Sequence, residues 1–221
     1  MKRQTLIILG ICIISLIATY ISYFYLPEQI PVHFDIDFQP DRYANKEWIF
    51  LIGISPLLCY LSGKFLKKIE PMKTDLEKNI YVYDIFISIL SLLFLGMNWV
   101  TIYFSFEEHI KNTEKFQIFP FFLGLCLILI GNYLPIVRKN YFLGIRTPFT
   151  LQGEISWKKT NRLGGYLFVT LGLLLCLGGI LGNKQIYIVT FLWFLIGILL
   201  LFVYSYFIYC KYDKKSLYFT I

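Results

Sequence analysis

Six long runs of apolar residues, separated by short polar segments, dominate the pattern of this chain. They fall at about 6–26, 48–66, 80–104, 116–137, 163–182 and 186–209. A bilayer core about 30 Å thick needs roughly 20 apolar residues per helix. The pattern therefore predicts an all-α membrane protein, a polytopic bundle of six transmembrane helices that leaves no chain for a soluble domain of ordinary size.

Composition supports this class, because 57% of the 221 residues are hydrophobic and only 16% are charged. The first run follows Lys2 and Arg3 and resembles a secretory signal. It continues to Leu26 without a small-residue cleavage site. We therefore expect it to remain as the first membrane span.

The positive charges predict an orientation, because short cytoplasmic loops hold an excess of Lys and Arg. With both termini cytoplasmic, the outer loops hold only five bases, and the other 16 of the 21 lie inside. The outer five are Arg42, Lys46, Lys111, Lys115 and Lys184. This asymmetry also explains the net charge of +7 by contact with anionic lipid rather than with nucleic acid.

Residues for catalysis or metal binding are sparse in this sequence. His33 and His109 are the two histidines, and the five cysteines are distributed one to each of five predicted spans. Patterns typical of hydrolases, metalloproteases and nucleotide sites are absent. We therefore expect neither an enzyme nor a metal or cofactor.

Polar residues inside the spans are the next candidates, because ionisable groups in a membrane are expensive and often functional. Asp84 is the one carboxylate within a predicted span, near its cytoplasmic end. We favour a boundary carboxylate paired with Arg146 or Lys158 over a transport role. Asn98 and Asn132 are expected to form hydrogen bonds between helices.

Glycines repeat along the fifth span, where Gly165, Gly172 and Gly179 recur every seven residues. Small residues on one stripe let helix backbones approach closely. We expect a buried packing helix here. The sixth span is rich in large aromatic side chains and is expected to face lipid.

The first outer loop, 27–47, contains five acids and two bases. Its prolines favour extended backbone, so we expect a structured extracellular loop with HFDIDF in strand-like alternation and QPDRY in a turn. Its apolar positions would pack on the helix ends or contact an apolar ligand. The alternative is a solvated loop that avoids translocating positive charge.

The cytoplasmic loop 138–162 is basic, and a helix is expected to resume near Gly153–Glu154. On that helix Trp157, Thr160, Asn161 and Gly164 share one face, and three bases share another. The spacing predicts an interfacial amphipathic helix with Trp157 at headgroup level.

Two stretches resemble known family signatures. PEQIPVHFDIDFQPDRYANK resembles the extracellular signature of the DUF1648 domain, and GNYLPIVRKNYFLGIRTPFTLQGEISWKKTNRLGGYLF is similar to a signature of the SdpI family. The resemblance divides the chain into a DUF1648-like region (1–66), a third span with its loops (67–115), an SdpI-like region (116–210) and a cytoplasmic tail (211–221). This chain departs from the family patterns at Phe38, Phe149 and Asn161, where Gly, Trp and His are usual.

The resemblance also implies a set of site residues. For a toxin-facing loop, the resemblance gives Pro31, His33, Asp41, Arg42 and Lys46. The charged and apolar positions of the same loop add Phe34, Asp35 and Asp37. The candidates for a cytoplasmic motif are Asn132, Asn140, Gly144, Arg146, Thr147, Pro148, Thr150, Trp157, Thr160 and Gly164.

The function implied by the resemblance is immunity to, or sensing of, a secreted peptide toxin of the sporulation-delaying type, at a bacterial cell membrane. Signalling would hold an ArsR-type repressor at the cytoplasmic face, so that nucleic acid is not contacted directly. The alternative hypothesis is a small transporter or accessory permease subunit in which Asp84 and the Arg146 loop line a path.

Overall fold

The computed structural model describes residues 2–36, 38, 40–71, 80–106 and 117–214. Within these ranges, six helices are long and apolar enough to cross a membrane, which confirms the predicted fold class. They are α1 (Lys2–Tyr23), α2 (Trp48–Ile69), α4 (Ile80–Phe106), α5 (Ile118–Tyr133), α7 (Glu154–Leu181) and α8 (Lys184–Ile208). Short elements complete the fold: β1 (Gln29–Phe34), β2 (Pro40–Asn45), α6 (Pro148–Gln152), a 3-10 turn (Leu134–Ile136) and a π-helical turn (Tyr209–Asp213).

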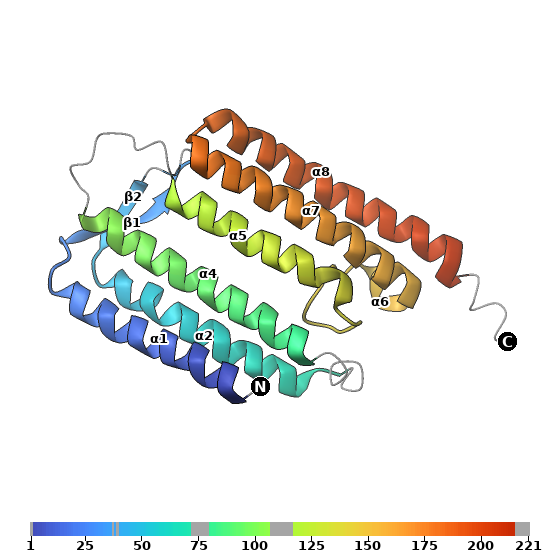
Figure 1. The fold of residues 1–221 in the computed structure, drawn as a ribbon, viewed down its shortest axis with the longest axis horizontal. Coiled ribbons are helices and arrows are strands. Elements are labelled where there is room, and N and C mark those ends of the chain that lie inside the picture. Colours follow the sequence, from blue (N-terminus) through green and yellow to red (C-terminus); the bar gives the residue numbers. More distant parts are fainter. Residues whose placement is uncertain (1, 37, 39, 72–79, 107–116, 215–221) are drawn as a thin grey trace.

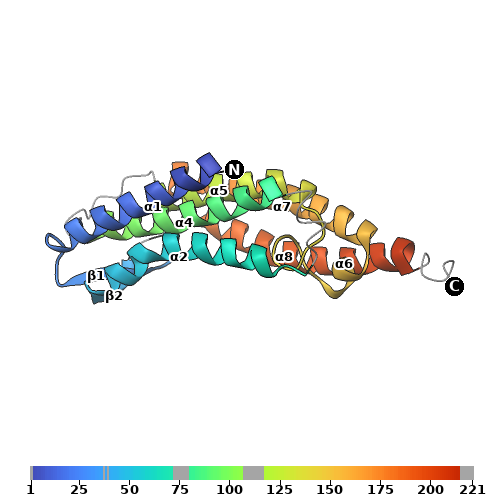
Figure 2. The same cartoon turned by 90° about the horizontal axis from the view of Figure 1, so that it is seen from below.

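The six long helices lie side by side in the order of the chain (Figure 1). Neighbours run antiparallel, and α2 and α8 lie below the layer formed by α1, α4, α5 and α7 (Figure 2). The strands β1 and β2 form an antiparallel hairpin at one end of the bundle, called here the hairpin end. Residues 138–153 and α6 lie at the other end, called the loop end.

The glycine stripe of α7 packs closely against a neighbouring helix, as the sequence predicts, and the structure shows that this helix is α5. A Cβ atom added at Gly172 would come within 2.5 Å of the backbone oxygen of Gly124, and one at Gly165 within 2.7 Å of that of Gly131. A Cβ at Gly179 would likewise meet the start of α5. The backbones of α5 and α7 therefore touch directly, which only glycine permits.

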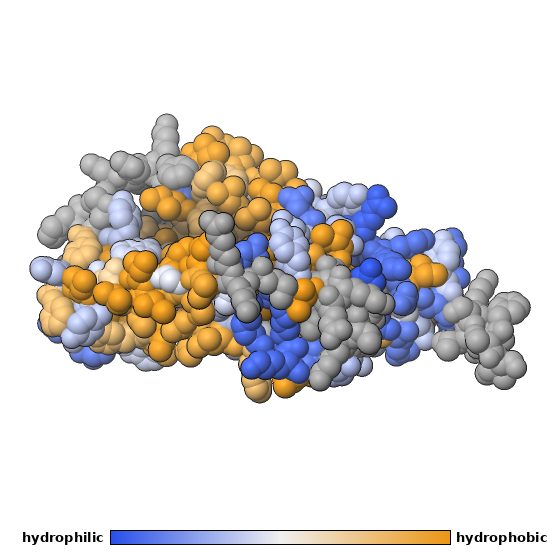
Figure 3. All heavy atoms as spheres, turned by 60° about the horizontal axis from the view of Figure 1, so that its bottom comes forward, coloured by the Kyte–Doolittle hydropathy of each residue, from blue (hydrophilic) through white to orange (hydrophobic). Residues whose placement is uncertain are grey.

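The surface divides by polarity along the length of the bundle. Figure 3 shows apolar side chains over much of the visible part of the bundle and hydrophilic ones gathered at the end where α6 lies. Many large apolar side chains of α8 are exposed, including Leu199 and Phe207. Such a surface is unsuited to water and suited to lipid, as the sequence predicts for the sixth span.

Buried polar side chains join helices in the hairpin half of the bundle. The Asn98 side-chain amide of α4 donates to the Thr19 hydroxyl of α1 over 2.9 Å, so the predicted role of Asn98 between helices is confirmed. The same prediction for Asn132 is wrong, because its amide donates to the Ile128 carbonyl one turn earlier in its own helix. Asn132 is exposed there and has no facing helix to reach.

Candidate functional site

The hairpin holds most of the residues expected to face a toxin. Its register pairs Ile30 with Ala44 and His33 with Arg42, with irregularities on both sides of His33. Pro40 begins β2, a strand position that needs no donor from proline. The prediction that QPDRY forms a turn is wrong, because Pro40 to Tyr43 lie in β2. The reversal instead uses Phe38, whose φ of 56° lies in the left-handed region and whose N–H donates to the Asp35 carbonyl.

Apolar residues attach the hairpin to the ends of the helices. Ile30 is fully buried and clusters with Leu26, Ile49 and Ile102. Phe34 meets Phe104 of α4 edge-on, with ring centroids 5.3 Å apart. The hairpin is therefore a packed part of the bundle, and Pro31 and Phe34 belong to its buried or half-buried side.

Charged and polar residues form the exposed side of the hairpin. His33 Nδ1 lies 2.6 Å from Asp41 Oδ1, and Arg42 is exposed beside them. Lys46 forms an ion pair with Glu28 at 3.1 Å, and this hydrogen bond raises the pKa of Lys46. Asp35 is half-buried, and Asp37 lies outside the described residues.

At the loop end, Asn140 shapes the start of the segment. It is buried, its side-chain oxygen accepts the N–H groups of Phe142 and Leu143, and its amide donates to the carbonyls of Arg138 and Leu143. One side chain thus takes the place of a regular backbone ladder. Substituting it would leave several backbone groups without partners.

The short helix α6 is capped by the threonines of the motif. Thr147 is its N-cap and accepts the Thr150 N–H, while the Thr150 hydroxyl accepts the Thr147 N–H. Pro148 occupies the first turn, where its missing N–H costs nothing. The Thr147 hydroxyl also donates to Ser205 of α8 over 2.9 Å, so this cap connects α6 to α8.

The first turns of α7 contact the 138–153 segment. The Ile145 N–H donates to the Asn161 side-chain oxygen at 2.8 Å, and Gly144 (φ 98°) lies too close to Asn161 for any Cβ. Asn161 therefore holds the 138–153 segment through its side-chain oxygen. Gly164 is buried against Ile145, and the buried hydroxyl of Thr160 has no partner among the described residues.

The prediction that Trp157 sits at headgroup level is wrong. Trp157 is 1% exposed and belongs to the main core cluster. Its indole N–H donates to the Val137 carbonyl at 2.8 Å, which satisfies the polar group that usually draws Trp to an interface. Trp157 therefore fixes the end of α5 to the start of α7.

Asp84 has partners other than those expected. Its carboxylate accepts the ammonium groups of Lys64 at 3.0 Å and Lys67 at 2.9 Å. Pairing with Arg146 or Lys158 is therefore contradicted. The two lysines are three residues apart on α2, which packs beside α4, and this places both opposite Asp84.

The two bases expected near Asp84 have partners elsewhere. Arg146 is exposed and donates to the Tyr141 carbonyl within its own loop. Lys158 pairs with Glu154 on α7 at 3.5 Å. Both residues therefore act locally at the loop end.

Two carboxylates that the sequence analysis passed over also hold the loop end. Glu70, at the end of α2, is fully buried and accepts the Tyr141 N–H with both oxygens. Asp213 accepts the N–H groups of Ile155 and Ser156 in the first turn of α7. No local sequence pattern signals either contact, because each joins residues more than 50 positions apart.

The motif residues at the loop end thus bond chiefly to backbone groups and to each other. Among the described residues no group of His, Cys, Asp or Glu is arranged to hold a metal ion. The arrangement is a network that fixes one conformation of the 138–153 segment against α2, α7 and α8.

Two regions of the chain match models of known protein families. Residues 136–210 match the model of the SdpI/YfhL protein family, and residues 10–54 match a domain of unknown function, DUF1648. The chain is thus similar to the SdpI/YfhL family in its C-terminal part. It is 26% identical over 213 residues to the immunity protein SdpI of Bacillus subtilis (strain 168), covering 96% of this chain and 98% of that protein. No solved structure matches.

The two matched regions of the chain include the hairpin at one end of the bundle and the 138–153 segment at the other. The DUF1648 match covers α1 from residue 10, the hairpin and the start of α2. The SdpI/YfhL match covers the loop-end network with α7 and α8.

Proposed function

We propose that this multi-pass membrane protein is an immunity protein, which protects its cell against a secreted, membrane-active peptide toxin. The observation that carries the proposal is the similarity to the immunity protein SdpI along nearly the whole of both chains. The fold supports it, since the described residues form six helices able to span a membrane and a hairpin packed on one end of the bundle.

The hairpin end is the extracellular end in this proposal, and both termini are cytoplasmic. This orientation follows from the excess of Lys and Arg in the predicted inner segments. A toxin that arrives from outside would then meet the exposed side of the hairpin first.

Charge supports recognition at the hairpin. The segment 27–47 holds five acids and two bases, a net charge of −3 that the Lys46–Glu28 ion pair does not change. A cationic amphipathic peptide would be steered to such a surface. Steering of this kind is screened over about 8 Å at physiological ionic strength, so its contribution falls as salt is added.

A killing assay tests this proposal. The chain is expressed in a sensitive bacterium and challenged with the sporulation-delaying peptide toxin at two salt concentrations. We expect protection relative to empty vector. Changing Asp35, Asp37 and Asp41 together to Asn should lower protection most at low salt, because association loses its electrostatic steering, which is worth on the order of tenfold or more in rate.

The matched control is Glu154→Gln, which removes a carboxylate at the loop end. It should leave protection unchanged, with immunoblots showing equal membrane abundance of all variants. Lack of protection by the parent chain would remove the proposed function for this toxin. Full protection by the triple variant would remove the hairpin acids from recognition and leave immunity standing.

Signalling through an ArsR-type repressor is the finer part of the proposal. A half-polar cavity of about 290 Å³ at the loop end, lined in part by Arg138, Lys139 and Lys158, offers a basic surface for an acidic partner. Recruitment of a small winged-helix repressor to membranes that contain the parent chain, and its loss in Arg138→Gln/Lys139→Gln, would support this. Equal recruitment by both chains would exclude this surface.

Transport is less well supported as a function. It requires Asp84 and the Arg146 loop to line a path, but Asp84 is held by Lys64 and Lys67 and Arg146 bonds within its own loop. We therefore assign Asp84 a structural role.

A further inference from the structure

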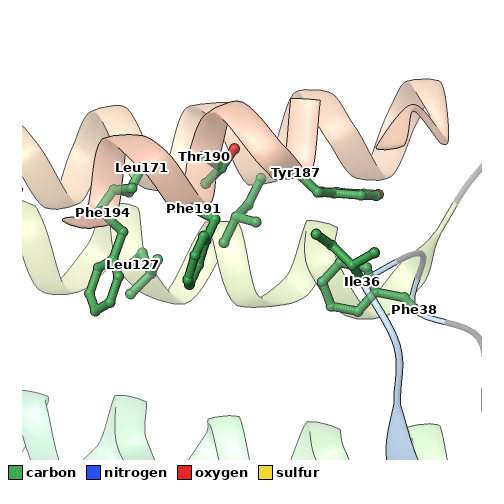
Figure 4. Close-up of a pocket in the computed structure, with 9 residues that line it drawn as sticks. Ile36, Phe38, Leu127, Leu171, Tyr187, Thr190, Phe191 and Phe194 are labelled. Carbon is green, nitrogen blue, oxygen red and sulfur yellow. The ribbon is translucent and has the colours of Figure 1, made fainter. Parts of the chain in front are cut away.

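An apolar cavity of about 260 Å³ lies directly beneath the turn of the hairpin (Figure 4). Ile36 and Phe38 of the turn cover one end, and Leu127 of α5 lies toward the other. Leu171 of α7 and Phe194 of α8 lie at the same end as Leu127, and Phe191 of α8 lies between that end and the turn. The cavity is larger than the apolar cavities of about 150 Å³ that hold benzene, so it has room for a substantial hydrocarbon group.

The polar atoms in the cavity wall are already satisfied. The Thr190 hydroxyl donates to the Ile186 carbonyl at 2.7 Å, and the Tyr187 hydroxyl donates to the Gln117 side chain. A ligand that buried polar atoms here would lose their hydration without gaining a partner. The wall therefore selects for an apolar occupant.

The cavity reaches about as far along α8 as the thickness of one leaflet of a bilayer. Along α8 the lining extends from Tyr187 to Phe194, and α8 begins at Lys184. The lining from Tyr187 to Phe194 is therefore about 10 Å long, and Phe194 lies about 15 Å from the start of α8, which is half of a hydrocarbon core about 30 Å thick. A single side chain of a peptide is too short to fill this depth.

The cavity also opens onto the surface that faces lipid. It is only half enclosed, and the exposed rings of Phe191 and Phe194 form part of its rim. The lipid contact of α8 is thus continuous with the cavity. An apolar cavity open to a bilayer gains dispersion contacts when a chain fills it.

We propose that this cavity binds one acyl chain of a phospholipid from the leaflet on the hairpin side, with Ile36 and Phe38 covering the headgroup end of the chain. Phe38 is held over the cavity in the left-handed region, which residues with a Cβ seldom adopt. Its ring contacts Phe119 and Tyr187, with centroids 5.6 and 4.9 Å away. These contacts stabilise an otherwise unfavourable backbone conformation and place the ring as a cover.

Photolabelling tests this assignment. The full chain is reconstituted in phosphatidylcholine vesicles with a trace of phosphatidylcholine that carries a diazirine near the end of one acyl chain, and labelled residues are mapped by mass spectrometry. Leu171 and Leu175 are only 7% and 9% exposed, whereas Leu173 on the same helix is 55% exposed. We expect labelling of Leu171 and Leu175 at a level similar to that of Leu173. Labelling of Leu173 alone would overturn the proposal.

Matched substitutions on α5 sharpen the test. Leu127→Trp fills the cavity, while Leu129→Trp places the same ring on an exposed position two residues away. Leu127→Trp should reduce labelling of Leu171 and Leu175 at least fivefold, and Leu129→Trp should not. Equal labelling in both variants would overturn the proposal.

Position along the acyl chain gives a second measurement that needs no variant. A diazirine near the glycerol should label Ile36 or Phe38, and one near the chain end should label Leu127 or Leu171. The same labelled residues for both probes would contradict the proposed direction of the chain.

A peptide occupant is tested in parallel. The probe is an amphipathic peptide of Leu and Lys that carries one photoactivatable leucine. If this peptide labels Leu171 and Leu175 and the lipid does not, the occupant is a peptide side chain and the proposal is overturned.

Discussion

Asp213 supplies from the end of the chain the cap that α7 lacks. The N-cap position of α7 is Gly153, which has no side chain to bond the free N–H groups of the first turn. Asp213 Oδ1 accepts the Ile155 N–H at 3.1 Å, and Oδ2 accepts the Ser156 N–H at 2.8 Å. These are the N2 and N3 donors that an Asp at the N-cap itself would bind. We therefore predict that Asp213→Ala destabilises the bundle.

The magnitude follows from two contributions. Loss of an N-cap costs about 1 kcal/mol, and loss of a partly buried negative charge at a helix N-terminus costs up to about 2 kcal/mol. Asp213→Ala should therefore lower the free energy of unfolding by about 2–3 kcal/mol, and Asp213→Asn by about 1 kcal/mol. For a chain of this size 1 kcal/mol corresponds to about 2–4 °C in Tm, so Asp213→Ala should lower Tm by about 4–12 °C.

Gly153 provides a second arm of the same experiment. A Cβ at Gly153 would collide with the Asp213 carboxylate, although its extended backbone suits alanine. As a single substitution, Gly153→Ala should thus displace Asp213 and destabilise the protein. In the Asp213→Ala background the main collision is gone and Ser156 Oγ remains at 2.6 Å. The two changes should therefore be less than additive, by about 1–2 kcal/mol.

Thiol-reactive fluorescence during heating measures this cycle in detergent. Cys12 and Cys126 are buried free thiols that react only when the bundle opens. Strictly additive shifts in Tm, or an unchanged Tm in Asp213→Ala, would refute the capping role.

Three further predictions follow from single contacts. Asp84→Asn should lower Tm by about 4–8 °C, because Lys64 and Lys67 lose a largely buried partner. The cost is about 2 kcal/mol once the partial exposure of the two lysines is allowed for. An unchanged Tm would show that these ion pairs do not stabilise the fold. Gly172→Ala should abolish folded protein in membranes, whereas Gly10→Ala, with nothing within 4 Å, should not; equal abundance would contradict close packing of α5 and α7. A cysteine at Asp41 should react with an impermeant maleimide in intact cells and one at Gln152 only after permeabilisation; the reverse pattern would invert the proposed orientation.

The sequence predicts the parts of this fold that depend on local composition. The six spans follow from apolar runs long enough for a bilayer, and the stripe of Gly165, Gly172 and Gly179 indicates a close helix contact whichever helix lies opposite. These features require no knowledge of which elements are neighbours. The structure adds that the neighbour is α5.

The sequence does not predict contacts that depend on which helices are adjacent. Asp84 has several bases at a similar depth, and only the packing of α2 beside α4 selects Lys64 and Lys67. Trp157 follows the pattern of an interfacial residue, but the Val137 carbonyl satisfies its indole in the core. The sequence does not predict the contacts of Glu70 with the Tyr141 N–H and of Asp213 with the first turn of α7 for the same reason, since an acid shows no local preference for a distant N–H group.

The packing also identifies which helix is able to couple the two ends of the molecule. Sensing requires an element with two arrangements, and the touching backbones of α5 and α7 do not permit sliding. The helices α7 and α8 meet through side chains rather than backbones, because a Cβ at Gly197 would meet the Leu167 side chain at 3.6 Å and one at Gly178 would collide with the Tyr187 ring. At the hairpin end α8 lines the cavity, and at the loop end its Ser205 accepts the Thr147 hydroxyl that caps α6. Small shear movements of packed helices are a common means of such coupling. A change at the cavity that moves α8 would therefore act directly on the α6 cap, and the Thr147 to Ser205 contact is where a response should first be measured.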